Sequence, residues 1–353
     1  MERTRRVEIY TGYSCNLRCA FCYYIERLSE EKPPIECLKA ELIRARKYGA
    51  LDVDFTGGEP TIRTDLPELI AFARNLGYRD ICIITNGQML SKPGCCEKLV
   101  KQGLNDVLFS IHGLYETHDQ LTRVPGSFRR ITDAVENIKN LGVKFRTNTT
   151  VVKHNFRQLP EMGAFFLKLK PESVNFIVFN PWYSSGSQKE EVTSRYSESA
   201  PFLKKAIDAL APSIKKVTVR YMPYCFMEGY EKYVCNFPHR KYDTDEWSHS
   251  TRLRLDSKFF WGSILYRTIR YRVPPKRFSD IDDLADHVVV RQVQRSLHVK
   301  AEQCPMCKYY KICDGVKKGY AQLFGLSEIN PVKGERIKDF MYFRGPYLNK
   351  LDG

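Results

Sequence analysis

The segment Cys15-Asn-Leu-Arg-Cys19-Ala-Phe-Cys22 lies near the start of the chain and carries three cysteines in eight residues. Its short spacings let three thiolates converge on one small inorganic centre while the chain loops around that centre. Thiolates are soft ligands that suit iron–sulfur clusters and zinc. The segment therefore predicts a metal centre close to the N-terminus.

Three thiolates leave a choice between two kinds of centre. A cubane cluster has four iron corners, so three cysteines would leave one iron open for another ligand. A structural zinc site needs a fourth protein ligand, and no cysteine or histidine stands within the dozen residues after Cys22. His112 and His118 lie far along the sequence. We favour the cluster and keep a closed zinc site as the alternative.

A second motif, Gly57-Gly58-Glu59-Pro60, follows an expected strand. Glycines allow backbone to approach a neighbour closely, and the adjoining carboxylate can accept hydrogen bonds from an ammonium group. The alternative interpretation of these four residues is an ordinary turn.

Together the two motifs resemble those of the radical S-adenosylmethionine (radical SAM) enzymes, with Phe21 before the third cysteine and Gly57–Pro60 as the GGEP motif. The resemblance implies that the open iron chelates the amino and carboxylate groups of SAM. An electron from the reduced cluster would then cleave SAM to a 5′-deoxyadenosyl radical. It also implies that Phe21, Gly57, Gly58 and Glu59 contact SAM.

Composition limits the class of protein. The chain has 353 residues, 43% of them hydrophobic, and no apolar run of membrane-spanning length. Twelve cysteines without a secretion signal indicate metal chemistry in a reducing cytoplasm. The net charge of +15 favours anionic partners, among them phosphorylated metabolites, acidic peptides, nucleic acid and anionic lipid.

Strands and helices alternate through the first part of the chain. We expect strands over residues 7–11, 51–56, 81–85, 107–111, 143–152 and 173–179, and helices over 36–48, 66–76, 93–102, 128–141, 156–169 and 195–211. Such βα units predict a parallel sheet. The resemblance implies an α/β fold with a partial (β/α)6 TIM-type barrel; the pattern alone also fits a doubly wound sheet. We place a barrel domain at residues 1–211 and a smaller C-terminal domain at residues 212–353, which begins with a strand over 215–221.

Chemistry in parallel α/β folds lies at the carboxyl ends of the strands. Four polar residues stand at or just after expected strand ends and are candidate SAM ligands: Asn86, Ser110, Arg123 and Asn148. Arg123 could pair with a carboxylate through two hydrogen bonds. Loop and turn roles are the alternative for each, and His112 and His118 could serve in acid–base chemistry or as capping residues.

A second group of cysteines occupies the C-terminal region: Cys225, Cys235, Cys304, Cys307 and Cys313. Its pattern resembles the SPASM and Twitch domains, which carry auxiliary [4Fe–4S] clusters in many radical SAM enzymes. Lys317 replaces a further cysteine of the full SPASM pattern, so we expect one auxiliary cluster. Five cysteines offer four ligands with one spare, and we favour Cys235 over Cys225 for the fourth place. A zinc ribbon is the alternative.

Residues 252–277 combine eight Lys or Arg residues and five aromatic residues with one acidic residue, Asp256. Such a segment could bind phosphates and stack bases. The alternative is an element with an apolar face inside and a solvated basic face outside.

The resemblance implies an enzyme that abstracts hydrogen from a substrate C–H with the 5′-deoxyadenosyl radical and needs an electron donor such as flavodoxin or ferredoxin. We expect oxidation or epimerisation of a small or phosphorylated molecule, assisted by one auxiliary cluster. Only fourteen residues precede Cys15, too few for a leader-peptide-binding domain, so a peptide or protein substrate ranks second. A tRNA-modifying enzyme and a non-catalytic module that binds metal and nucleic acid are further alternatives.

Overall fold

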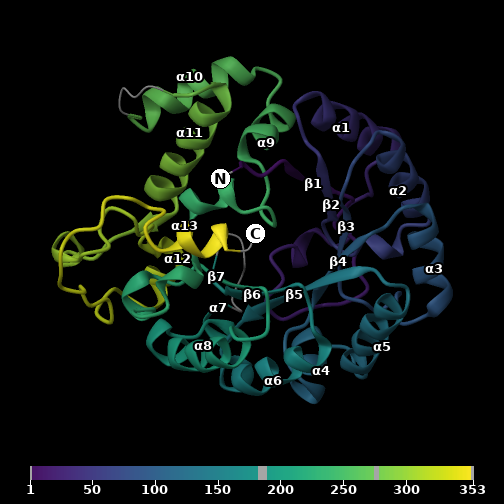
Figure 1. Ribbon diagram of the computed structural model, residues 1–353, viewed down its shortest axis with the longest axis horizontal. Coiled ribbons are helices and arrows are strands. Elements are labelled where there is room, and N and C mark those ends of the chain that lie inside the picture. Colours follow the sequence, from purple (N-terminus) through teal and green to yellow (C-terminus); the bar gives the residue numbers. More distant parts are fainter. Residues whose placement is uncertain (1, 182–188, 274–277, 351–353) are drawn as a thin grey trace.

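The computed structural model describes residues 2–181, 189–273 and 278–350. Its centre is one sheet of eight strands whose spatial order follows the order of the chain, each strand running parallel to its neighbours. Figure 1 shows this sheet curving as an open barrel inside an arc of helices. The strands are β1 (Arg6–Tyr10), β2 (Asp52–Thr56), β3 (Ile81–Thr85), β4 (Asp106–Ser110), β5 (Lys144–Val151), β6 (Ser173–Val178), β7 (Lys216–Arg220) and β8 (Val234–Cys235).

The helices between the strands cover the outside of the sheet because each carries an apolar stripe at helical spacing. Leu38, Leu42 and Ala45 of the first helix are fully or almost fully buried against the strands. These helices are α1 (Ile35–Lys47), α2 (Leu66–Asn75), α3 (Pro93–Gln102), α5 (Ser127–Asn140), α6 (Leu159–Leu169) and α8 (Tyr196–Leu210). Two further helices, α4 (Tyr115–Thr122) and the short α7 (Lys189–Val192), also lie between strands in the chain.

The expected α/β partial barrel is confirmed, with eight strands in place of six. Strands β7 and β8 follow residue 211 and extend the same sheet, so the sheet continues past the boundary that we place there from the sequence. Helix α4 has no counterpart among the expected elements. The Ser184–Gln188 stretch, a break ahead of the helix expected over 195–211, lies outside the described residues.

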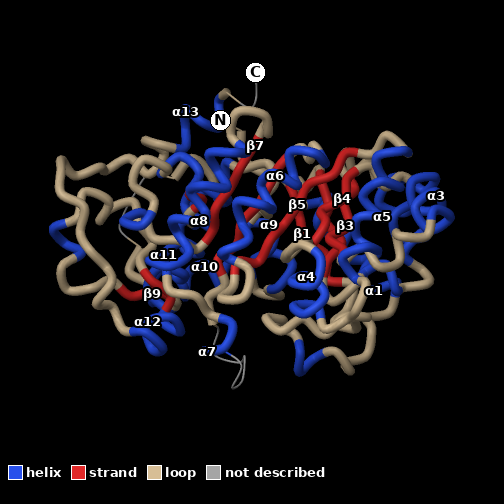
Figure 2. Tube along the Cα trace, turned by 90° about the horizontal axis from the view of Figure 1, so that it is seen from below, coloured by secondary structure: helices blue, strands red, loops and turns tan. Residues whose placement is uncertain are grey.

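The rest of the chain forms a lobe beside the open edge of the sheet (Figure 1). Its elements are α9 (His249–Asp256), α10 (Phe260–Arg270), α11 (Ile281–Ser296), β9 (His298–Val299), β10 (Val316–Lys317), α12 (Lys318–Phe324) and α13 (Arg344–Asn349). Strands β9 and β10 pair antiparallel. In Figure 2, α13 and both chain termini lie at one end of the sheet, and α7 and α12 lie at the other.

The barrel interior is charged at the end where the strands begin. Arg6 of β1 pairs with Asp54 of β2 at 2.7 Å, and Arg146 of β5 pairs with Asp106 of β4 at 2.6 Å. All four side chains are at most 4% exposed. Buried charges are tolerated only when they are paired. These ion pairs therefore hold β1 beside β2 and β4 beside β5.

The segment that follows β8 completes this network from the lobe. Asp245 contacts Arg146 at 3.3 Å, and the Trp247 indole Nε1–H donates to Asp54 at 2.8 Å. The Ser248 amide donates to the Arg6 carbonyl, next to a parallel bridge between Arg6 and Trp247. The lobe is therefore tied to the first strand of the barrel at its amino end.

Replacement of Arg146 by methionine should strongly destabilise the protein. The change leaves Asp106 and Asp245 without their shared cation, and loss of one partner of a buried pair costs about 3–5 kcal/mol. Anaerobic urea unfolding of Arg146→Met, followed by circular dichroism, measures this cost.

Lys139→Met is the matched control, since Lys139 pairs with Glu136 on the surface and the loss should stay below about 1 kcal/mol. Equal unfolding midpoints for the two variants would show that the interior network does not hold the sheet together.

Candidate functional site

The three N-terminal cysteines lie in the loop after β1, at the carboxyl ends of the strands. Cys15, Cys19 and Cys22 are all half-buried. Burial raises the pKa of Cys15 to about 11 and that of Cys19 to about 12. Other cysteines of the loop raise both pKa values further. Thiolates packed in this way need a positive centre between them, which a metal cluster supplies.

The loop is held on one side by the Gly57–Glu59 turn. The Gly58 amide donates to the Gly12 carbonyl at 2.8 Å, and the Glu59 amide donates to the Ser14 carbonyl at 2.9 Å. A Cβ atom on Gly57 would lie 2.2 Å from the Gly12 oxygen, and one on Gly58 would lie 2.1 Å from the Ser14 oxygen. The glycines are therefore required for contact with the cysteine loop, a neighbour that the sequence did not identify.

Helix α4 holds the other side of the loop. The Arg18 and Ala20 amides donate to the carbonyls of Thr122 and Leu121 at the end of that helix. The ring of Phe21 packs edge-on against His112, with ring centroids 4.7 Å apart. Phe21 thus anchors the loop in a small apolar cluster whatever else it contacts.

The Glu59 carboxylate is 3% exposed and accepts four hydrogen bonds. One oxygen accepts from the Thr61 amide at 3.0 Å, the Thr61 hydroxyl and the Thr85 hydroxyl at 2.7 Å, and the other accepts from the Asn86 amide at 2.7 Å. Burial raises the pKa of Glu59, and these donors act against that rise. Glu59 therefore locks the ends of β2 and β3 together beneath the cysteine loop.

Asn86 lies beside the first cysteine. Its side-chain amide donates to the Cys15 thiol at 3.7 Å and to the Asn16 side chain at 2.7 Å. The Leu17 amide also points at the Cys15 sulfur, at 3.4 Å. Donors directed at a ligating sulfur stabilise its thiolate form.

The remaining candidates occupy neighbouring strand ends. Ser110 of β4 stands opposite Asn148 of β5, which stands opposite Asn175 of β6. The Asn148 Oδ1 atom is buried and has no hydrogen-bond partner, as expected where a ligand or water binds. Arg123 is exposed at the end of α4, and its charge partly offsets the burial that raises the pKa of Cys19.

Sequence reasoning missed two asparagines that belong to this region. Asn175 is 2% exposed on the interior face of β6, and Asn180 follows that strand. The Tyr23 hydroxyl donates to the Asn180 carbonyl at 2.7 Å, which ties the residue after Cys22 to β6. The rule that selected Asn86 applies equally to Asn180, which directly follows an expected strand.

The two histidines near β4 act as buried acceptors. Nδ1 of His118 accepts from the His112 amide, and Nδ1 of His112 accepts from the Thr150 amide, both at 3.1 Å. Burial lowers the pKa of His118 to about 4 and that of His112 well below its usual value. Both rings are neutral near pH 7. Through their Nδ1 acceptors they hold the strand ends in place and do not serve in proton transfer.

Four of the five C-terminal cysteines line one small cavity of about 30 Å³: Cys225, Cys304, Cys307 and Cys313. Burial raises the pKa of Cys225, and the other three thiols raise it further. Backbone amides point at two of the sulfurs, Gly315 at Cys313 and Val332 at Cys307, each at 3.4 Å. We call this cavity the four-cysteine pocket.

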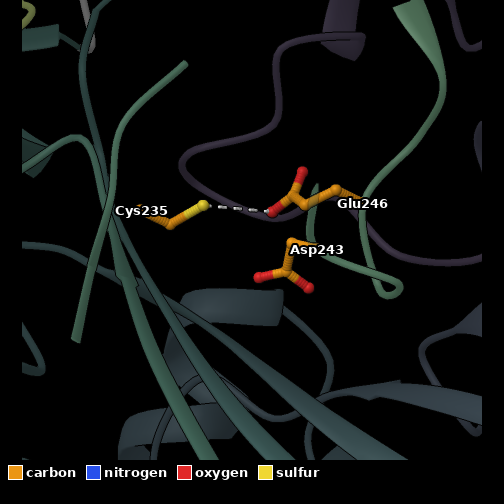
Figure 3. Close-up of side chains that lie close together, drawn as sticks. All are labelled: Cys235, Asp243 and Glu246. Carbon is orange, nitrogen blue, oxygen red and sulfur yellow. Dashed lines mark hydrogen bonds between the residues drawn. The ribbon is translucent and has the colours of Figure 1, made fainter. Parts of the chain in front are cut away.

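Cys235 lies elsewhere, against Glu246 and near Asp243 (Figure 3). Among the described residues, only this trio offers three ligand atoms within 4.8 Å of one another, as one ion would require. The carboxylates are already neutralised, Asp243 by Lys216 and Arg344 and Glu246 by Arg220 and Arg240. A metal cation there would meet four cationic side chains, two of them buried and two partly buried, so the trio does not suit a metal.

The structure thus groups Cys225 with the other three thiols and gives Cys235, which we favour from the sequence, different neighbours. In neither cysteine group do three sulfurs approach within 4.8 Å of one another.

A parallel half-barrel with three thiols at the carboxyl ends of its strands defines an iron–sulfur enzyme of the α/β class. Residues 9–166 match the radical SAM superfamily, so this part of the chain is a radical SAM domain. The family implies a [4Fe–4S] cluster and SAM as cofactors, and Cys15, Cys19 and Cys22 fit the cluster.

Two curated relatives match most of this chain. Fe-coproporphyrin III synthase of Methanosarcina barkeri is 27% identical over 336 residues, which cover 85% of this chain and 80% of that protein. A probable GTP 3′,8-cyclase of Thermoplasma volcanium is 28% identical over 74% of this chain and 80% of that protein. Matches to other such cyclases cover only 53–57% of those proteins.

The fold is shared over almost the whole chain with a solved structure described as native anSMEcpe with bound AdoMet and Kp18Cys peptide. The two agree with a TM-score of 0.57 at 16% identity, covering 98% of this chain and 99% of the other. The lobe therefore belongs to the shared architecture together with the barrel.

Replacement of Glu59 by glutamine should lower the stability of the barrel mouth. The new amide group would face hydrogen-bond donors on whichever side it points, and a buried polar mismatch costs about 1–3 kcal/mol. Thermal unfolding of anaerobically purified Glu59→Gln measures the loss.

Glu36→Gln serves as the control, because Glu36 is exposed on α1 and its loss should cost less than about 0.5 kcal/mol. If Glu59→Gln unfolds at the same temperature as the Glu36→Gln control, the four hydrogen bonds do not hold the turn.

Proposed function

We propose that this enzyme cleaves SAM reductively at the loop of Cys15, Cys19 and Cys22 and abstracts hydrogen from an anionic small molecule. When bound, a reduced [4Fe–4S] cluster supplies the electron that splits SAM into methionine and the 5′-deoxyadenosyl radical. The observation that carries the proposal is the placement of three half-buried thiols in one loop over the strand ends, where Asn86 and the Leu17 amide direct hydrogen bonds at Cys15.

The chain's own residues would prepare that site. The cysteine loop is held in a fixed position over β2 and β3 by Gly57, Gly58 and Glu59. Ser110 and Asn148 stand side by side at the next strand ends, and the unpartnered Asn148 oxygen is a hydrogen-bond acceptor open to SAM. Arg123, exposed near Cys19, is a candidate partner for the SAM carboxylate. Phe21 excludes water from the base of the loop.

The four-cysteine pocket supports an auxiliary [4Fe–4S] cluster ligated by Cys225, Cys304, Cys307 and Cys313. Four protein ligands fill all four iron corners, so such a cluster supplies electron transfer and offers no open iron to a substrate. The substrate would lose one hydrogen atom to the deoxyadenosyl radical and one electron to the auxiliary cluster, with a proton released. That balance is a two-electron oxidation that consumes one SAM and one electron from the reductant.

The proposed substrate class rests on the net charge of the chain and on the two relatives that match most of it. The net charge of +15 favours an anion, and Fe-coproporphyrin III synthase and GTP 3′,8-cyclase both take their names from anionic small molecules. We therefore favour a carboxylated tetrapyrrole or a nucleotide. A peptide is the second candidate, because the structure that matches the whole chain binds one.

The first test replaces Cys15, Cys19 and Cys22 by alanine. Loss of the three ligands should abolish formation of 5′-deoxyadenosine from SAM under reduction, measured by liquid chromatography, and should remove about four irons per chain. Cys37→Ala controls for thiol loss, since Cys37 is exposed and apart from both groups. Continued SAM cleavage by the triple variant would refute the proposed function.

The second test compares Cys225→Ala with Cys235→Ala. Reconstituted wild type should hold about eight irons, Cys225→Ala should fall toward about four, and Cys235→Ala should keep about eight. Iron analysis together with electron paramagnetic resonance of the reduced proteins measures the difference. Cys225→Ala should still cleave SAM, because the first centre is unchanged.

A wild type with about four irons and about one zinc would contradict the auxiliary cluster and favour the zinc alternative. Iron loss in Cys235→Ala with none in Cys225→Ala would overturn the ligand assignment.

A further inference from the structure

Helix α10 exposes an apolar stripe to solvent. Trp261, Leu265 and Ile269 follow one another at intervals of four residues, so they lie on one face of the helix. They are 69%, 63% and 69% exposed, respectively. Phe259 and Tyr266 border them and are also exposed. We call these five residues the α10 stripe.

The stripe is unusual within this protein. It holds five of the eleven large hydrophobic side chains that are exposed among the described residues. The other face of α10 is already used, because Ile264 is 3% exposed and packs with Leu253, Ala285 and Val288 of the lobe. The helix thus has one apolar face inside and a second outside, contrary to the purely basic outer face considered from the sequence. Of the basic residues in that segment, Lys276 and Arg277 lie outside the described residues.

Positive charge flanks the stripe. Lys258 precedes α10, and Arg270 and Arg272 stand at its end, all exposed. No acidic residue occurs from Ser257 to Val273. The nearest acidic side chains are already paired, Asp256 with Arg252 at 2.8 Å and Asp282 with Arg254 at 2.6 Å. The stripe therefore has cations at both ends and no free carboxylate among them.

We propose that the α10 stripe docks this protein on the surface of an anionic lipid bilayer. A convex helix with Trp, Phe and aliphatic side chains on one face and Lys or Arg beside them is the form that binds membrane interfaces. The apolar side chains enter the boundary between headgroups and acyl chains, and the cations reach lipid phosphates. Among the described residues no helix is both long and apolar enough to cross a bilayer.

Two other occupants fit less well. A second copy would bring Lys258 of one α10 toward the cations of the other in either direction of pairing, and like charges oppose that contact. A nucleic acid would stack on aromatic rings, but Leu265 and Ile269 of the stripe offer no such surface. An acidic bilayer accepts aliphatic and aromatic side chains alike.

The experiment measures sedimentation of the full-length holoprotein with vesicles, under anaerobic conditions. Vesicles of equal parts phosphatidylglycerol and phosphatidylcholine should bind the wild type, and vesicles of phosphatidylcholine alone should bind it more weakly. The variant Trp261→Ala/Leu265→Ser/Ile269→Ser should lose at least about tenfold in partitioning. Ile43→Ser/Leu141→Ser/Tyr342→Ala is the matched control, since it removes one aromatic and two aliphatic exposed side chains elsewhere and should bind like the wild type.

Unchanged iron content and thermal unfolding in both variants would show that they fold. Equal vesicle binding by the stripe variant and the control would overturn the proposal. A wild type that self-associates or binds single-stranded RNA through the stripe, while ignoring anionic vesicles, would overturn it in favour of those partners.

Discussion

Two buried arginines inside the barrel constrain the rest of the structure. Arg6 and Arg146 stand on strands β1 and β5, and each is held by carboxylates from neighbouring strands. A half-open barrel cannot fill its interior with apolar side chains alone, because water reaches its open edge. Paired charges are stable at such a partly hydrated position. They also fix the register of the strands, because a slip of one strand would leave a buried charge unpaired. Asp245 joins the network from the lobe, so the C-terminal region contributes to the closure of the barrel.

The opposite end of the sheet is organised by contacts between strand ends and the lobe. The Asn180 carboxamide donates to the Tyr221 carbonyl and accepts from the Tyr196 hydroxyl. Tyr196 in turn stacks on Tyr320 of α12 with ring centroids 3.9 Å apart. Gly319 fits against Pro181 so closely that a Cβ atom would lie 2.1 Å from the Pro181 oxygen. These contacts join the end of β6 to the helix that follows the C-terminal cysteines, so both thiol sites are positioned on one frame.

The sequence predicted the strands and helices of a parallel sheet because their signals are local, whereas the barrel was expected from the resemblance to the radical SAM enzymes. Apolar periods and glycine stops locate β1 to β7 and most covering helices to within one or two residues. The cysteine spacing and the Gly57–Glu59 motif singled out two segments that the structure places together at the strand ends. Contacts between distant segments carry no such signal: nothing local indicates that Gly57 and Gly58 pack on the backbone of residues 12–14. Beyond residue 221 the short elements are set by packing, and the exposed face of α10 could not be distinguished from its buried face.

The choice between Cys225 and Cys235 shows why spacing alone could not settle the second thiol site. Both cysteines stand at comparable distances along the chain from Cys304, and they differ in their position relative to the pocket and in the charges around them. Burial raises the pKa of Cys235 to about 12 even with Arg344 close by, and its neighbours Asp243 and Glu246 already have cationic partners. Cys225 instead faces three other thiols across an apolar cavity, where only Lys300 among the lining residues is cationic. Four thiolates in that cavity require a positively charged centre, whereas Cys235 requires none.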